Sequence, residues 1–169
     1  LNLAASLAAI GQRVLLVDVD PQGNLTSGVS LKGQSAEAGT VYNALTQVEP
    51  LTDARPFVMP TRRERLALIP ADRNLTGAEI EMVPLVRREE RLRMLLESVR
   101  TEYDNIFIDS PPSLGLLTLN ALVSADAVLI PLHCEYYALE GLAYLWGTIR
   151  RVRGALNPSL DIEGVLFTM

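Results

Sequence analysis

The stretch Val14–Asn24, VLLVDVDPQGN, decides how the rest of the chain is interpreted. Its first four residues are apolar, and a continuous apolar run is typical of a strand that a parallel sheet buries on both faces. Asp18 and Asp20 stand two positions apart, so we expect their side chains to point the same way in an extended segment. Pro21 and Gly23 then turn the chain. Carboxylates at such a strand end suit a hydrated magnesium ion or a water nucleophile, although a solvated turn without a ligand has the same pattern.

A second acidic strand end lies in Tyr103–Ser113, YDNIFIDSPPS. Its apolar run ends at Asp109 and has the form of a Walker B segment, in which the acid at the strand end holds magnesium beside a nucleotide phosphate. Many strands of α/β proteins end in Asp, so this segment indicates little alone. Ligands of parallel α/β sheets bind at the carboxyl ends of the strands. Two acidic strand ends in one domain therefore favour a metal–phosphate site.

Strands and helices alternate along the chain, which predicts an α/β fold with a mostly parallel sheet flanked by helices on both faces. The apolar face of one helix, over 87–101, predicts that Leu92, Leu95, Leu96 and Val99 are buried. The predicted strands are 13–17, 66–70, 105–108, 127–132 and 162–169. The predicted helices are 1–10, 40–45, 74–82 with Asn74 as its cap, 87–101, 114–123 and 137–156.

Composition excludes several classes of protein. The 169 residues are 49% apolar, enough for the core of one domain or of a piece of one. A net charge of −5 argues against a wholly basic nucleic-acid binder but allows a local basic patch. The single cysteine, Cys134, excludes a disulfide framework and a cysteine-only zinc site. No apolar stretch reaches the roughly 18 residues of a membrane span, so these features fit a cytoplasmic protein.

The two ends of the chain are expected to be truncated. Residues 1–10 predict a helix that Gly11 closes but that has no visible beginning, and 164–169 predict a buried strand with no turn after it. A P-loop, G-x-x-x-x-G-K-[ST], supplies backbone N–H groups and a lysine to phosphates. The only lysine, Lys32, stands in a segment that does not fit this motif. Because a P-loop precedes a helix, we expect the motif immediately before Leu1.

Taken together, these segments resemble the ParA/Soj-type partitioning ATPases of the MinD/ParA superfamily. The segment after the family's deviant Walker A loop resembles residues 1–29, LNLAASLAAIGQRVLLVDVDPQGNLTSGV. The family's Walker B strand and the helix after it resemble residues 103–122, YDNIFIDSPPSLGLLTLNAL. PLHCEYYALEGL, residues 131–142, is similar to the family's P-x-x-x-E-Y-x-A-L-E-G segment, and GVLFTM to a later strand. The resemblance is weakest over 33–65. It implies a P-loop NTPase-like fold, with 1–169 as part of one nucleotide-binding domain.

The resemblance also implies a function. Members of the family hydrolyse ATP with Mg²⁺, form a homodimer with ATP between the subunits, bind DNA without sequence preference, and are stimulated by a ParB-type partner. The cycle segregates chromosomes or plasmids at the nucleoid in the cytoplasm, and no membrane is expected. In this sequence Asp20 matches the acid that positions the attacking water, Asp109 the magnesium ligand, and Asp18 a supporting metal-site acid. The residues placed at the nucleotide are Asp18, Pro21, Gln22, Gly23, Asn24, Pro111 and Pro112. Without a P-loop, residues 1–169 alone are expected to be inactive.

Other polar and aromatic residues have two interpretations each. His133 and Cys134 could bind a metal, but adjacent residues of a strand point in opposite directions, which favours a structural role. Glu135 and Glu140 fit a structural or interface segment better than catalysis. Tyr136, Tyr137, Tyr144 and Trp146 are expected in packing or in a dimer. Three arginine clusters suit either DNA phosphates or solvated helix faces: 62, 63 and 65; 87, 88, 91 and 93; and 150, 151 and 153.

Three rival functions remain open. A MinD-type ATPase that positions cell division needs an amphipathic membrane helix beyond Met169, and the DPQGN and EYYALEGL segments favour the ParA type. An iron–sulfur reductase of the same superfamily bridges a cluster with cysteines from both subunits, which one cysteine argues against. A non-enzymatic binding module would have a degenerate site, whereas Asp20 and Asp109 are both present.

Overall fold

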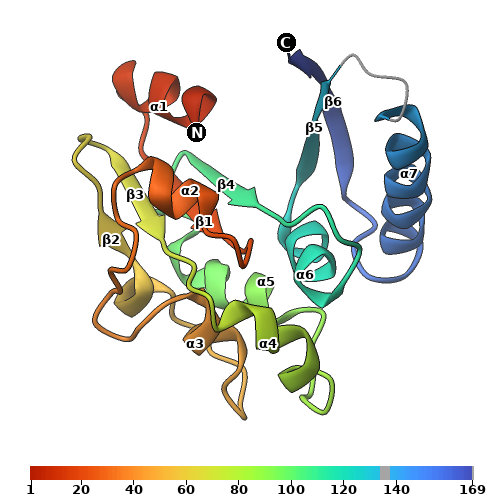
Figure 1. The fold of residues 1–169 in the computed structure, drawn as a ribbon, viewed down its shortest axis with the longest axis horizontal. Coiled ribbons are helices and arrows are strands. Elements are labelled where there is room, and N and C mark those ends of the chain that lie inside the picture. The colour runs from red at the N-terminus through yellow and green to blue at the C-terminus, as the bar shows by residue number, and fades with distance from the viewer. Residues whose placement is uncertain (134–137, 169) are drawn as a thin grey trace. The chain divides into compact units, whose positions relative to one another are not determined.

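The computed structural model describes residues 1–133 and 138–168 of the chain. Its internal contacts divide it into two compact units, Leu1–Ala121 and Leu122–Met169, and each unit is considered by itself. Unit 1 is built on a four-stranded sheet in the order β2-β3-β1-β4 (Figure 1). The strands are β1 (Val14–Asp18), β2 (Met59–Pro60), β3 (Leu66–Ile69) and β4 (Asn105–Asp109).

Strand β1 lies inside this sheet and runs parallel to both of its neighbours. Val14 is opposite Leu66 of β3, and Asp18 is opposite Asp109 of β4. Every residue of β1 is buried, as its continuous apolar run predicts. The sequence does not predict β2, which pairs antiparallel with β3 and contains Pro60, a residue that strand interiors disfavour. The predicted α/β fold with a mostly parallel sheet is confirmed.

The side chains of β1 alternate between two hydrophobic clusters. Leu15 and Val17 lie in a cluster with residues of α3, α4 and α5, whereas Val14 and Leu16 lie in a cluster with residues of α1. Burying a Val or Leu side chain contributes about 1.5–3 kcal/mol, so a shift of one residue would be costly on both faces. The helices of unit 1 are α1 (Asn2–Ala9), α2 (Asn24–Gly28), α3 (Val41–Leu45), α4 (Leu75–Glu81), α5 (Arg91–Leu96), and the 3₁₀ helices η1 (Arg55–Phe57) and η2 (Glu97–Val99).

Two helix predictions need correction. The helix predicted over 87–101 is an α-helix only over Arg91–Leu96 and is followed by the 3₁₀ helix η2. Arg87 lies outside it with a φ of +52°, in the left-handed region that an α-helix excludes. The four apolar residues of its predicted face are nevertheless buried, as expected. Asn74 occupies the position before α4, but its side chain makes no capping hydrogen bond. The short helix α2 was not predicted, and it proves to be part of the site.

Unit 2 contains a two-stranded parallel sheet and one long helix. The C-terminal part of α6 (Leu116–Ser124) leads into β5 (Ala127–His133), α7 (Ala138–Ala155) and β6 (Asp161–Thr168). The buried amide of Asn157 donates hydrogen bonds to the carbonyl oxygens of Leu122, Val123 and Ala125, and so holds the end of α6. None of the helices within the described ranges is long and apolar enough to span a membrane.

The edges of the two sheets differ in what they present. Strand β4 pairs with β1 and, among residues 1–133 and 138–168, with no other strand. The strand at 161–168 is not the buried strand that the sequence predicts. Val165, Leu166 and Phe167 are 40%, 50% and 67% exposed in β6, which pairs only with β5 within the described residues.

A buried arginine donates hydrogen bonds to the backbone at the end of α3. Arg91 is 2% exposed, and its guanidinium donates hydrogen bonds to the carbonyl oxygens of Leu45, Gln47 and Val48 at the end of α3. It also donates to the carbonyl oxygen of Val86. Arg91 was grouped with arginines expected to face solvent or DNA phosphates. Its burial contradicts both interpretations, since the guanidinium serves to satisfy backbone oxygens that lack partners past the helix end.

Replacing Arg91 should therefore cost stability. Arg91→Met preserves an apolar stem but leaves several buried carbonyl oxygens without donors, and we expect the free energy of unfolding to fall by about 3 kcal/mol. Urea unfolding followed by circular dichroism measures it. Arg93→Met is the matched control, because Arg93 is partly exposed and pairs with Glu90 at 2.7 Å, an interaction worth about 0–1 kcal/mol. Equal losses in the two variants would contradict this account of Arg91.

Candidate functional site

The carboxyl edge of the unit 1 sheet brings the two predicted acidic strand ends together. Asp18 ends β1 and Asp109 ends β4, and the two are direct partners in the parallel register. The Val19 N–H donates to the carbonyl oxygen of Asp109 at 2.9 Å, which extends the pairing one residue past the strands. Neighbouring strands lie about 4.8 Å apart, so the two carboxylates start from adjacent backbone positions.

The carboxylate of Asp18 is fully buried and is held by three hydrogen bonds. Its Oδ2 accepts from the backbone N–H of Thr26 at 2.8 Å and from the Thr26 hydroxyl at 2.6 Å, and its Oδ1 accepts from the Asp20 N–H at 3.2 Å. Thr26 Oγ1 also accepts from the N–H of Ala71, which follows β3. Burial raises the pKa of Asp18, and the hydrogen bonds from Thr26 oppose that rise. Asp18 thus ties together β1, the first turn of α2 and the segment after β3.

The loop between β1 and α2 presents the second acid. The Asp20 carboxylate accepts a hydrogen bond from the Gln22 N–H at 2.9 Å, and the Asp20 carbonyl accepts from the Gly23 N–H at 2.9 Å. Gly23 has a φ of +61°, a left-handed conformation that favours glycine, and α2 begins at Asn24. Asp20 is only partly exposed, whereas Asp18 is buried. The two acids predicted to point the same way therefore stand in different environments.

Asp109 is the exposed acid of the edge. Partial burial of its carboxyl raises the pKa of Asp109, and the nearby charges of Asp18 and then Asp20 raise it further. After Asp109 the chain is held by Thr118, whose hydroxyl donates to the carbonyl oxygens of Pro111 at 3.2 Å and of Ser113. The negative charges of Asp18 and Asp20 therefore make the ionised form of Asp109 less favourable unless a cation lies nearby.

The donor set fits magnesium in one of its usual binding modes. Within the described ranges, no group of three or more His, Cys, Asp or Glu side chains could hold a metal ion by itself. Mg²⁺ commonly keeps several waters and binds through one or two carboxylates together with substrate phosphates. The exposed carboxylate of Asp109, beside the buried Asp18, fits that mode and not an all-protein cage.

Sequence reasoning missed Thr26, the residue that organises the site. Nothing in the sequence signals it, since α2 was itself not predicted and the contact with Asp18 spans eight positions and depends on the fold. Arg87 and Arg93 pair with Glu90, and Arg88 pairs with Glu89, so with the buried Arg91 this cluster is not an open basic surface. Of the other predicted residues, 134–137 lie outside the described residues, and the side chains of His133 and Glu140 are likewise not described.

The chain is similar to known proteins in both sequence and fold. A family model described as an AAA domain matches residues 1–162. The chain is 54% identical over 169 residues to the chromosome partitioning protein ParA of Myxococcus xanthus, covering all of this chain and 58% of that protein. It is 54% identical over 168 residues to the sporulation initiation inhibitor protein Soj of Bacillus subtilis, covering 99% of this chain and 65% of that one. The chain therefore spans about three fifths of the length of these relatives.

Solved structures share the fold. Cobyrinic acid a,c-diamide synthase from Mycobacterium smegmatis, solved with an ATP analogue and magnesium, is 36% identical with a TM-score of 0.86, over 98% of this chain and 66% of that chain. A plasmid partition protein from Borrelia burgdorferi is 27% identical with a TM-score of 0.79, over 98% and 70% of the two chains. The fold is thus that of the P-loop ATPases. The chain belongs to the AAA domain family that its residues 1–162 match, and within it to the ParA/Soj type.

The raised pKa of Asp18 predicts how stability depends on pH. A carboxyl whose pKa is higher in the folded state than its ordinary value of 3.8 penalises folding once both states ionise, so this penalty grows as pH rises from below 3.8 through the folded pKa. Asp18→Asn retains an oxygen that accepts from Thr26 and removes the charge. We expect the stability of the variant relative to wild type to increase from pH 3 to pH 7, measured by urea unfolding without nucleotide or magnesium.

Asp104→Asn provides the control with the opposite sign. Arg13 binds the Asp104 carboxylate at 2.8 Å and lowers the pKa of Asp104 to about 2. This carboxylate stabilises the fold above its ordinary pKa and ceases to do so as pH falls, so Asp104→Asn should lose stability relative to wild type as pH rises. A pH-independent difference for Asp18→Asn would show that the charge of Asp18 does not oppose folding.

Proposed function

We propose that this chain forms the central part of an ATPase of chromosome or plasmid partitioning. The observation that carries the proposal is the pairing of Asp18 with Asp109 at the carboxyl edge of a parallel sheet, with Asp20 in the adjoining turn. This edge is where α/β sheets bind nucleotides. The relatives named ParA and Soj are 54% identical to the chain, against 36% for the amide synthase, which favours partitioning over amide synthesis.

In this proposal each acid has a separate task. Asp109 would hold Mg²⁺ through water at the exposed end of β4, and the ion, when bound with ATP, would neutralise charge on the phosphates. Asp20 would orient the attacking water: one carboxylate oxygen accepts from the Gln22 N–H, and this fixes the direction in which the other can accept a proton from water. Asp18 would support the metal site from its buried position and would position both acids through the Thr26 network.

The neighbouring residues of the two turns would line the nucleotide. Pro21, Gln22, Gly23 and Asn24 follow Asp20 in the turn whose backbone Gly23 reverses. Pro111 and Pro112 follow β4 in the segment that Thr118 holds in place. A phosphate-binding loop that supplies N–H groups and a lysine would complete the site.

The wider cycle is also a proposal that the relatives' names support. It includes an ATP-dependent homodimer, binding to DNA without sequence preference, stimulation by a ParB-type partner, and a place on the nucleoid in the cytoplasm. The MinD-type alternative has no support from the relatives named above, which are partitioning and sporulation proteins.

Substitution of the two acids should separate binding from turnover. In the product of the whole open reading frame, Asp20→Ala should slow ATP hydrolysis by about 10²–10⁴-fold and leave ATP affinity nearly unchanged, because Asp20 acts on water. Asp109→Ala should weaken magnesium-dependent ATP binding itself, because it removes a ligand of the ion. Nucleotide affinity by fluorescence titration and turnover by phosphate release are measured for each variant.

Asp104→Ala is the control for these two variants, since Asp104 immediately precedes β4 at the opposite edge of the sheet and pairs with Arg13. It should leave affinity and turnover near wild type. Wild-type turnover in Asp20→Ala, with DNA and the partner protein present, would remove Asp20 from its proposed role.

Residues 1–169 alone should not hydrolyse ATP. The sequence holds no G-x-x-x-x-G-K-[ST] segment, so the backbone cradle and the lysine for the phosphates are lacking within it. A phosphate-release assay of this segment checks the expectation. Turnover that Asp109→Ala abolishes would contradict it and would show that the segment is catalytic by itself.

A further inference from the structure

We propose that the tip of the β2–β3 hairpin, residues 61–65 (TRRER), binds the phosphate backbone of duplex DNA. The inference rests on the proposed function in that it assigns a surface to the DNA binding included there. The surface lies at the amino edge of the unit 1 sheet, whereas Asp18 and Asp109 lie at the carboxyl edge. One strand length of five residues, about 17 Å, separates the two edges.

The hairpin tip is a rigid turn. The Thr61 hydroxyl donates to the carbonyl oxygen of Leu66 at 2.8 Å and accepts from the Arg63 N–H at 3.1 Å, and the Thr61 N–H donates to the Leu66 carbonyl at 3.1 Å. Arg65 has a φ of +61°, which closes the turn in a conformation that non-glycine residues rarely adopt. Arg62, between them, is exposed. The turn therefore presents its arginines from a fixed backbone.

The tip is also attached to the rest of the sheet. The Arg65 guanidinium donates to the carbonyl oxygen of Gly11 at 3.0 Å, just after α1, and the Arg65 carbonyl accepts from the Val14 N–H at 2.8 Å. These contacts hold residues 61–65 against the connection between α1 and β1. A preorganised positive surface loses less conformational entropy on binding than a mobile loop does.

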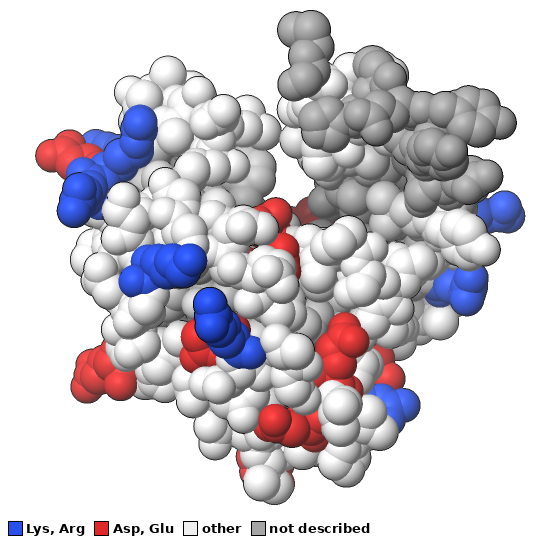
Figure 2. Space-filling model, in the orientation of Figure 1, with Lys and Arg blue, Asp and Glu red and all other residues white. Residues whose placement is uncertain are grey.

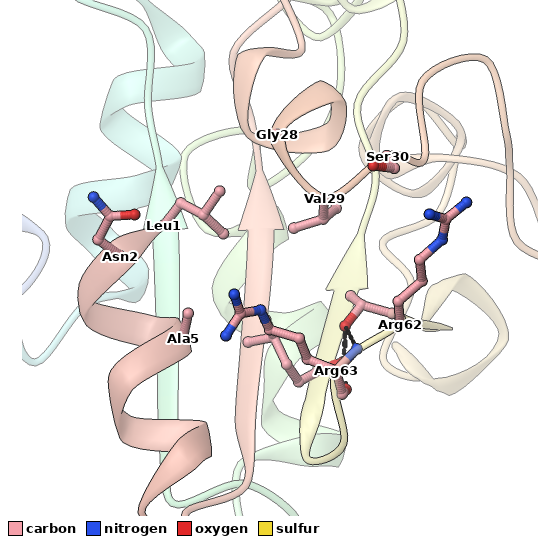
Figure 3. Close-up of a pocket in the computed structure, with 10 residues that line it drawn as sticks. Leu1, Asn2, Ala5, Gly28, Val29, Ser30, Arg62 and Arg63 are labelled. Atoms are coloured by element: carbon pink, nitrogen blue, oxygen red, sulfur yellow. Dashed lines mark hydrogen bonds between the residues drawn. The ribbon is translucent and has the colours of Figure 1, made fainter.

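Two hollows flank the tip, and Arg63 lines both. The first, about 230 Å³, lies between the tip, the start of α1 and the end of α2, and Arg62 and Ser30 also line it (Figure 3). In that view Arg63 extends toward α1 and Arg62 extends away from it. The second hollow, about 300 Å³, is lined by Ala5 and Ala9 of α1, by Arg65 and by the acidic side chain of Glu64. Ala5 of α1 and Arg63 line both hollows, so the two lie next to each other along α1, beside exposed arginines that can reach the phosphates of an extended polyanion.

Among the described residues, the arginines of this surface differ from several other arginines of unit 1 in that they form no ion pair with an acidic side chain. Arg13 pairs with Asp104 and Arg55 with Asp53. By contrast, Arg62 and Arg63 have no ion pair within the part of the chain that the structure describes. In Figure 2, basic side chains gather over the hairpin, at the upper left of the view, with an acidic side chain beside them. In a chain of net charge −5 such a local cluster is what phosphate contacts require, and duplex DNA carries one negative charge per roughly 1.7 Å of its axis.

The test is charge reversal at the tip. Arg62→Glu/Arg63→Glu is compared with Arg150→Glu/Arg151→Glu, which reverses two adjacent exposed arginines of α7 and changes the net charge equally. Fluorescence anisotropy measures the binding of a mixed-sequence duplex of about 30 bp with ATP and Mg²⁺, from roughly 50 to 200 mM NaCl. Both variants are made in the product of the whole open reading frame, and ATP affinity and turnover are measured alongside.

We expect the hairpin variant to bind DNA at least about tenfold more weakly and to lose about 2 from the slope of log K against log salt, one for each phosphate contact removed. Its ATP affinity and its turnover without DNA should stay near wild type, because the tip lies away from the acid site. Unchanged DNA binding, or an equal loss in the α7 variant, overturns the inference while the ATPase proposal stands. Failure of the proposed ATPase function shows instead as absent ATP turnover in the wild type.

Discussion

Everything at the carboxyl edge of the sheet depends on the buried hydrogen bonds between Asp18 and Thr26. An ionised carboxylate without partners could not stay in the interior, and here one backbone N–H and one hydroxyl compensate for the lost water. The N–H belongs to the first turn of α2, where Gly23, the residue before the helix, has no side chain to accept it. Asp18 therefore caps this helix through Thr26, which lies eight positions ahead of it. That contact determines the path of the whole turn that carries Asp20.

The environments of Asp20 and Asp109 differ from that of Asp18. The Asp18 carboxylate is buried, whereas the Asp20 carboxylate is partly exposed to solvent. The backbone N–H of Gln22 donates a hydrogen bond to the Asp20 carboxylate and sets its orientation. Asp109 lies opposite Asp18 on the neighbouring strand, at the exposed end of β4. These three aspartates thus differ in burial and in hydrogen bonding. The difference comes from the fold around them and not from their spacing in the sequence.

The sequence predicts the parts of this arrangement that depend on local pattern. The apolar run of β1 requires burial on two faces, and that burial requires parallel neighbours, which places Asp18 and Asp109 at one edge. The burial of Leu92 and Leu95 followed from helical spacing. Thr26 and Arg91 were not predicted, because each acts through contacts between segments distant in sequence. A charged side chain such as Arg91 is assumed to face water, and only the carbonyl oxygens at the end of α3 explain why it does not.

The half-buried strand β4 has a consequence for how the protein behaves in solution. Its outer edge, NIFID, presents backbone donors and acceptors beside three apolar side chains, and within the described residues no strand occupies it. Such an edge is a template for any strand of matching direction, whether from the same polypeptide or from another molecule. Protein chemists preparing this segment should therefore expect self-association through β4 at high concentration, and a parallel strand supplied to that edge should suppress it.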